Sequence, residues 1–132
     1  MTSGPGARSR CAALLAAGFA FGSAFLVYRD LTLPDVRDTE VWFGVALRGR
    51  AARLTAPLHW ALLAAGAWAW WTQRAWAARA TALYLAYVAL SHAIWSALNP
   101  RAEYAPHGLA LAAACALAAI PFWRKRARPQ PR

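Results

Sequence analysis

Four apolar stretches, each long enough to cross a lipid bilayer as a helix, occupy most of this chain. They comprise residues 11–28, 56–72, 76–98 and 106–123. None contains Asp, Glu or Lys, and Arg79 is the one arginine inside these limits. Because about 20 apolar residues in a helix span the ~30 Å hydrocarbon layer, the sequence predicts an all-α integral membrane protein. We expect a single membrane domain over residues 1–132, built as a four-transmembrane-helix bundle.

The composition excludes an ordinary soluble domain and a disordered chain. Hydrophobic residues make up 60% and charged residues 15% of the sequence, whereas a soluble domain has about 25% charged residues. Disordered chains are poor in aromatic residues, and this chain has 8 Trp. A net charge of +10 suggests nucleic acid as the partner of a soluble protein. Here the basic residues lie between the apolar stretches, so we expect a lipid bilayer and no nucleic acid.

The distribution of positive charge predicts the orientation in the membrane. Nine of the 15 Lys and Arg residues lie in the N-terminal tail, the turn at 72–79 and the basic tail at 124–132. The two other connections hold six, together with all five acidic residues. Because cytoplasmic segments are enriched in Lys and Arg, both termini are predicted to be cytoplasmic. The abundance of Ala and Arg favours a bacterial origin, hence a bacterial inner membrane, and the basic tail is expected to attract anionic lipid.

The first apolar stretch has a second interpretation, as a signal peptide, because Arg8 and Arg10 precede it. It is longer than the usual apolar core of such peptides, which has about 7–15 residues. No clear small-x-small cleavage site follows it. We therefore expect the stretch to be retained as a helix.

The connection at 29–55 is the one long loop, and loops of this length usually carry structure or function. Within it, Val41, Trp42, Val45 and Ala46 share one face if the segment is helical. The pattern predicts a short amphipathic helix in this first outer loop, lying at the outer membrane interface. The alternative is an ordered loop without a helix.

A polar stripe runs along the third apolar stretch. At 100° per residue, one arc of this predicted helix contains Thr81, Tyr84, Tyr87, Ser91, His92, Trp95, Ser96 and Asn99. Polar groups are costly in hydrocarbon, so the stripe must face other helices or a cavity. Two interpretations follow: hydrogen bonds between helices, or the lining of a ligand pocket.

The three histidines belong to the same outer half of the predicted bundle, and they define the candidate site. We predict a ligand pocket between the helices, with loop residues closing it as a lid. The predicted pocket residues are His92, Trp95, Ser91, Asn99, His59 and His107, with Glu40, Trp42 and Glu103 from the loops. His59, His92 and His107 are also the candidate ligands for a metal or haem. No H-x-x-x-H spacing supports that cofactor, and hydrogen-bonded or interfacial histidines are the alternative.

The sequence contains no catalytic motif: neither G-x-x-x-x-G-K-[ST] nor G-x-S-x-G occurs, and no acidic residue lies within an apolar stretch. Cys11 and Cys115 each lie alone in an apolar stretch. We therefore expect a small multi-pass membrane protein that acts by binding, either as an accessory subunit of another membrane protein or as a binder of lipid or a hydrophobic ligand. The alternatives are a haem- or metal-binding membrane redox protein and a small membrane enzyme acting on lipid.

Overall fold

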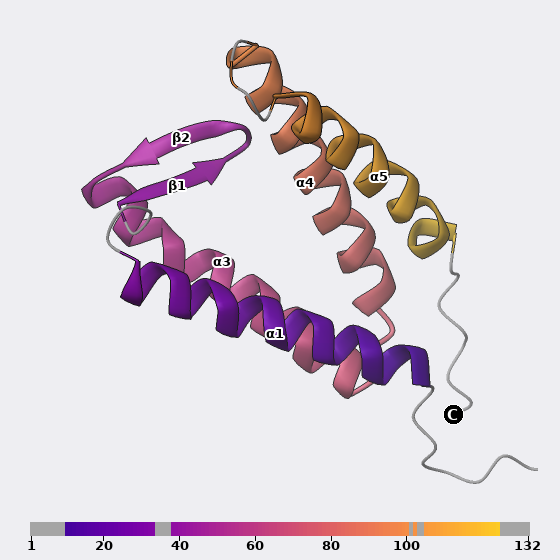
Figure 1. Cartoon of the computed structure of the whole chain (residues 1–132). Helices are drawn as coiled ribbons and strands as arrows, with labels where there is room; N and C mark the ends of the chain where they lie inside the picture. Colours follow the sequence, from indigo (N-terminus) through magenta and orange to yellow (C-terminus); the bar gives the residue numbers. More distant parts are fainter. Residues whose placement is uncertain (1–9, 34–37, 101, 103–104, 125–132) are drawn as a thin grey trace, which may run out of the picture.

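The computed structural model describes residues 10–33, 38–100, 102 and 105–124. These residues form four long helices and one two-stranded sheet (Figure 1). In chain order the elements are α1 (Arg10–Thr32), β1 (Thr39–Trp42), β2 (Val45–Arg48), α3 (Arg50–Trp71), α4 (Ala77–Leu98) and α5 (Ala105–Arg124).

Among the described residues, α1, α4 and α5 are long and apolar enough to cross a membrane. They coincide, within a few residues, with three of the four predicted stretches. The fourth stretch, 56–72, is also helical, but its helix α3 begins six residues earlier, at Arg50. Beyond Arg53, α3 still contains Pro57, His59 and four tryptophans, which lower its mean hydropathy. The described residues therefore form a mostly helical fold with three candidate membrane spans and one further long helix.

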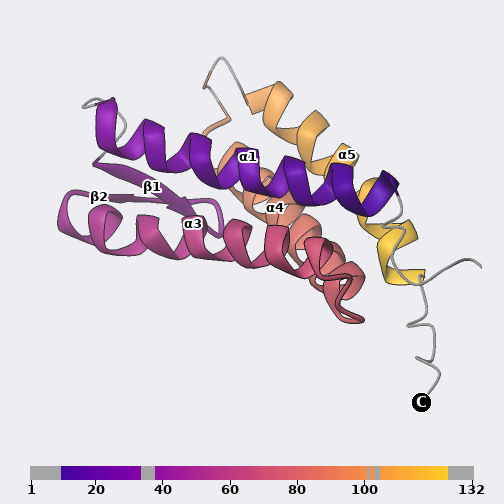
Figure 2. The same cartoon turned by 90° about the horizontal axis from the view of Figure 1, so that it is seen from below.

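The four helices are arranged as two pairs that converge at one end and diverge at the other. Helix α1 packs along α3, and α4 packs along α5, whereas α3 and α4 meet at few positions. Figure 1 shows the pairs meeting near the turn between α3 and α4, with the hairpin β1–β2 at the opposite, wide end. The view from below in Figure 2 places β1 and β2 between the ends of α1 and α3.

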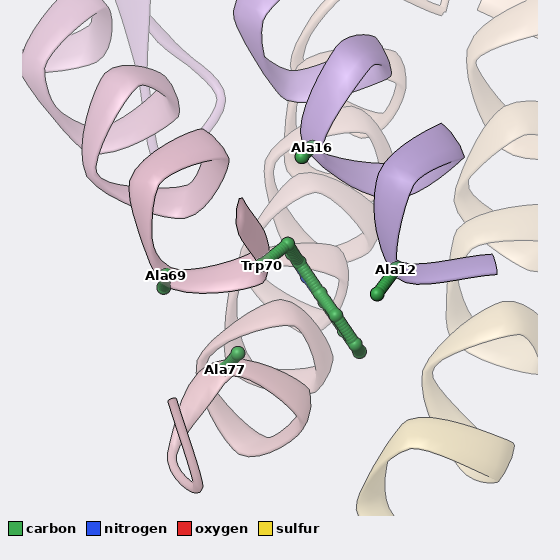
Figure 3. Packing of buried hydrophobic residues seen from close by; sticks show 5 residues of the cluster. All are labelled: Ala12, Ala16, Ala69, Trp70 and Ala77. Atoms are coloured by element: carbon green, nitrogen blue, oxygen red, sulfur yellow. The ribbon is translucent and has the colours of Figure 1, made fainter. Parts of the chain in front are cut away.

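The narrow end contains the hydrophobic core, which is built from alanines around one indole ring. Trp70, 7% exposed, packs with Ala12, Ala16, Ala69 and Ala77 (Figure 3). These alanines come from α1, α3 and α4, and such small residues let helix backbones approach closely. Trp70 also donates a hydrogen bond through Nε1 to Thr81 Oγ1 of α4 (2.9 Å). The buried indole therefore joins the two helix pairs where they converge.

The predicted amphipathic helix in the first outer loop is wrong, because residues 39–48 form an antiparallel β-hairpin. Trp42 pairs with Val45, which leaves Phe43 and Gly44 as a two-residue turn. Both turn residues have positive φ, 50° and 78°, as the tight hairpin turns that match strand twist require. Within β1, Glu40 is buried while its neighbour Thr39 is exposed. The tight turn and the burial of Glu40 prevail over the helical pattern.

The hairpin contacts both helix pairs and so connects them at the wide end. Its turn lies on α4, where Gly44 N donates to Ser91 Oγ (2.9 Å). A Cβ at Gly44 would lie 2.6 Å from the Ile94 Cβ atom, so only glycine allows this approach. On the other side, Arg53 of α3 donates to both oxygens of Asp38 (2.5 and 2.6 Å). The hairpin is thereby held between the diverging helices.

Candidate functional site

A cavity of about 540 Å³ lies at the wide end, next to the hairpin. All four helices and β1 contribute to its wall. The apolar part of the wall is formed by Leu26, Val41, Val88 and Leu111. The polar and aromatic part includes Arg29, Glu40, His59, Tyr84, Tyr87, Ser91, His92, Trp95 and His107. The cavity therefore has the mixed lining that is typical of small-molecule sites.

Glu40 is the central charged residue of this wall, and only 5% of it is exposed. Its Oε2 accepts a hydrogen bond from Arg29 Nη2 (2.8 Å), and its Oε1 is hydrogen-bonded to His59 Nδ1. A buried carboxylate is costly unless it is paired and hydrogen-bonded. Both oxygens of Glu40 have hydrogen-bond partners. Because Arg29 belongs to α1 and His59 to α3, Glu40 connects β1 to both helices.

Asp30 is a second buried carboxylate, directly beside the first. It is also 5% exposed, and Arg29 Nε donates to its Oδ1 (2.6 Å). Its Oδ2 accepts a hydrogen bond from Trp60 Nε1 of α3 (2.8 Å). Arg29 therefore bridges two carboxylates, and the C-terminal end of α1 is tied to both β1 and α3.

His59 links the buried carboxylate to the cavity. An ionised carboxylate only accepts hydrogen bonds, so Nδ1 of His59 carries the proton that faces Glu40. The other ring nitrogen, Nε2, lies 3.1 Å from the Tyr87 hydroxyl of α4. Trp42 stacks on the imidazole, with the ring centroids 4.0 Å apart and the planes at 8°. The result is a fixed chain from Glu40 through His59 to Tyr87, whose side chain lines the cavity.

Six of the nine predicted site residues line this one cavity. They are Glu40, His59, Ser91, His92, Trp95 and His107. His92 is partly buried, and within the described part of the chain no group hydrogen-bonds to its imidazole. A neutral imidazole offers one donor and one acceptor, so His92 has unused hydrogen-bonding capacity at the cavity wall.

Two of the three remaining predicted residues, Asn99 and Trp42, are not part of the wall. Asn99 ends α4, is exposed, and donates through Nδ2 to the carbonyl of Trp95 in its own helix (2.9 Å). Trp42 lies behind His59, and within the described chain its buried Nε1 has no hydrogen-bond partner. Glu103 falls outside the described residues.

The structure also bears on which histidines are available as metal or haem ligands. Both ring nitrogens of His59 are already within hydrogen-bonding distance of Glu40 and Tyr87. Among the residues that the structure describes, no group of three or more His, Cys, Asp or Glu side chains is arranged to hold a metal ion. His92 and His107 line the cavity, where they can serve as hydrogen-bonding groups.

Arg29, Asp30, Trp60, Tyr84 and Tyr87 were not predicted as site residues. Tyr84 and Tyr87 belong to the predicted polar stripe of α4, but only the later part of that stripe, from Ser91 to Asn99, was predicted to line the site. Arg29 and Asp30 follow directly on the first apolar stretch. A charged pair at the end of a span is most often a boundary signal, so the sequence offered no reason to place it in a buried network.

No protein-family model matches this chain, and no curated protein or solved structure is significantly similar to it. Its class therefore rests on its own residues. The described part of the chain is mostly helical and contains three helices long and apolar enough to be membrane spans. Its distinguishing feature is a cavity beside two buried carboxylates that share one arginine.

Proposed function

We propose that this chain is a membrane protein that binds a small amphipathic molecule in the cavity at the wide end. The observation that carries this proposal is the combination of a cavity of about 540 Å³ with an imidazole, that of His92, lacking a partner within the described chain. Ligand pockets typically have about 300–1,000 Å³ and a few polar groups in a largely apolar wall. This cavity meets both criteria.

The ligand's polar group would lie near His92 and Tyr87, and its apolar part along Leu26, Val88 and Leu111. The imidazole of His92 has unused hydrogen-bonding capacity, and the Tyr87 hydroxyl already contacts His59. The last three side chains are aliphatic residues of α1, α4 and α5. Those three helices are the candidate membrane spans. A molecule dissolved in the bilayer is therefore the natural ligand class.

In this proposal, α3 is the fourth span, and the protein lies in a bacterial inner membrane with both termini in the cytoplasm. A helix of 22 residues is ~33 Å long, and α3 packs along the candidate span α1 over its length. Charged residues of α3 lie in its first turns, beside the hairpin, where the membrane interface would be. The cavity then lies in the outer half of the membrane, and another membrane protein and anionic lipid at the basic tail remain proposed partners.

The test uses an alkyl alcohol that carries a photoreactive diazirine, added to the protein in phosphatidylcholine nanodiscs. Mass spectrometry then locates the labelled peptides. We expect labelling of α4 and α5 at the cavity wall, competed by excess dodecanol. The variant Val88→Trp fills the cavity and should abolish that labelling, whereas the control Leu83→Trp, at a position that is 60% exposed, should retain it. Labelling spread over all lipid-facing positions, and equal in both variants, would contradict the proposal.

A second candidate function, an enzyme acting on a lipid, is favoured by the chain Glu40–His59–Tyr87. A carboxylate that orients an imidazole, which in turn contacts a hydroxyl, is the arrangement used in general acid–base catalysis. The test is to incubate membrane lipid extract with the protein and to analyse it by mass spectrometry. A product formed by the original protein but not by Tyr87→Phe, with photolabelling unchanged, would favour the enzyme. Identical lipid profiles would favour binding alone.

A further inference from the structure

The charges beside the cavity do not cancel among the described residues. Asp30 and Glu40 are both 5% exposed, and both pair with Arg29. Two carboxylates therefore share one guanidinium, and the third partner in this cluster, the imidazole of His59, donates to Glu40 through Nδ1. Buried charge without a counter-charge is costly. A cation placed in the cavity would offset the excess negative charge.

Aromatic side chains of α4 line the same cavity and add a second attraction for a cation. Tyr84, Tyr87 and Trp95 are all part of the wall, and the ring centroids of the two tyrosines are 6.1 Å apart. The faces of aromatic rings carry partial negative charge, so they attract ammonium groups within about 6 Å. The Glu40 carboxylate and these aromatic rings therefore both favour a cation in the cavity.

The same arrangement opposes an anionic ligand. A phosphate or carboxylate group near Arg29 would also lie near Glu40, whose two oxygens already occupy that guanidinium and His59. Like charges at such short range repel strongly where water is excluded. A neutral hydroxyl would gain a hydrogen bond from His92 but would leave the excess charge unchanged.

We propose that the cavity selects a cationic amphiphile, with an ammonium group beside Glu40 and the aromatic residues and an alkyl part along the aliphatic wall. This inference rests on the proposed binding function and specifies the charge of its ligand. The ligand class is therefore a bilayer-soluble amine, and neutral and anionic amphiphiles of the same chain length should bind less tightly.

The experiment compares three competitors of the diazirine photolabel that share a C12 chain: dodecylammonium, dodecanol and dodecanoate. Using one chain length isolates the effect of the head group. We expect dodecylammonium to displace the label at about tenfold lower concentration than dodecanol, with dodecanoate the weakest. In Glu40→Gln, the advantage of the ammonium over the alcohol should disappear.

Asp38→Asn is the matched control, because it also removes one carboxylate, but from the exposed pair with Arg53 outside the cavity wall. Each probe partitions into the nanodisc lipid to the same extent whichever variant is present, so the comparison between the two variants cancels this effect. Should Glu40→Gln fail to bind dodecanol, Asp30→Asn removes the other buried carboxylate and replaces it in the comparison.

The outcomes separate this inference from the proposed function. Equal displacement by dodecylammonium and dodecanol would overturn the inference and leave the binding function intact. Tightest binding of dodecanoate would also overturn it. An ammonium advantage that persists in both buried-carboxylate variants would show that its source lies elsewhere. If no competitor displaces the label, the binding function itself fails.

Discussion

Glu40 of β1 and His59 of α3, 19 residues apart in the sequence, form a buried hydrogen-bonded pair beneath the indole ring of Trp42. The pair connects the hairpin to a long helix and is held on the other side by Arg29. Because the carboxylate, the imidazole and the guanidinium are all at least partly buried, the stability of this end of the molecule depends on keeping them together.

Replacing Glu40 by alanine should destabilise the protein by about 2–3 kcal/mol, since it leaves the partly buried His59 imidazole without its acceptor and Arg29 with Asp30 as its remaining carboxylate partner. Glu40→Gln should cost less, because the amide oxygen can still accept one hydrogen bond. Unfolding in a mild detergent, followed by circular dichroism, measures both. A loss below about 0.5 kcal/mol for Glu40→Ala would show that the network contributes little to stability.

The docking of the hairpin on α4 is tested by Gly44→Ala. Here the new Cβ would lie 2.6 Å from Ile94 Cβ and 2.7 Å from the Ser91 carbonyl oxygen. Gly49 is the matched control, because it also has a positive φ, 59°, but nothing lies within 4 Å of its added Cβ. Both variants incur the cost of a side chain at positive φ, about 1 kcal/mol.

Gly44→Ala should be the more destabilising of the two by at least about 1 kcal/mol, because the new Cβ would overlap with Ile94 Cβ and force the turn away from α4. It should also make the hairpin more accessible to protease, as the turn leaves Ser91. Melting temperature and limited proteolysis measure these effects. Equal losses in the two variants would mean that the close approach of Gly44 to α4 is not required.

At the narrow end, Thr81→Val should destabilise the protein by about 1 kcal/mol. Valine has nearly the same shape but no acceptor for Trp70 Nε1, which is 2.9 Å from Thr81 Oγ1, so the buried indole N–H loses its partner. Thr72→Val is the control, because Thr72 Oγ1 is exposed and only donates to its own helix. If the control is as destabilising as Thr81→Val, the hydrogen bond is not the cause.

The number of spans determines on which sides of the membrane the termini lie. Four spans place both termini on one side, whereas three place them on opposite sides. We expect reporter fusions at the N- and C-termini to give cytoplasmic signals and a fusion near residue 45 to give an external one. Opposite signals from the two termini would show that α3 does not cross the membrane.

A metal chelator should leave the melting temperature unchanged within about 1 °C. His59 already directs both ring nitrogens to Glu40 and Tyr87, so a structural metal would have to displace these contacts. Thermal unfolding with and without EDTA tests this, and a third measurement records the melting temperature after zinc is added back. A drop of several degrees with EDTA, restored by zinc, would revive the metal-binding alternative and implicate His92 and His107.

The helices were predictable because their signal is local. An apolar run bounded by Asn99 and Pro100 specifies where α4 ends, whatever the rest of the chain does. The hairpin was not predictable in this way, since Val41, Trp42, Val45 and Ala46 fit a helical face. Its formation depends on a turn at Phe43 and Gly44 and on contacts with Arg29, His59 and Ser91, which lie in three different helices.

The cavity wall was partly predictable for a related reason. The periodicity of α4 places Ser91, His92 and Trp95 on one face, and the structure shows that this face lines a cavity. The pairing of Glu40 with Arg29 and His59 is a tertiary contact between a strand and two helices, and the hydrophobic periodicity within each element does not predict which elements meet. Nothing in the sequence around Arg29 distinguishes a boundary charge from a partner of a buried carboxylate.

The alanines around Trp70 have a consequence for the opposite end of the molecule. Helices are stiff, and those of 22 residues are ~33 Å long, so the angle at which the two pairs meet is transmitted to their far ends. The two helix pairs meet where Ala12, Ala16, Ala69 and Ala77 pack against the Trp70 indole, so this packing sets the angle between the pairs. The width of the cavity therefore depends on this packing at the narrow end as well as on the hairpin at the wide end. A methyl group added at one of these alanines should move the cavity walls, although none of the four lines the cavity.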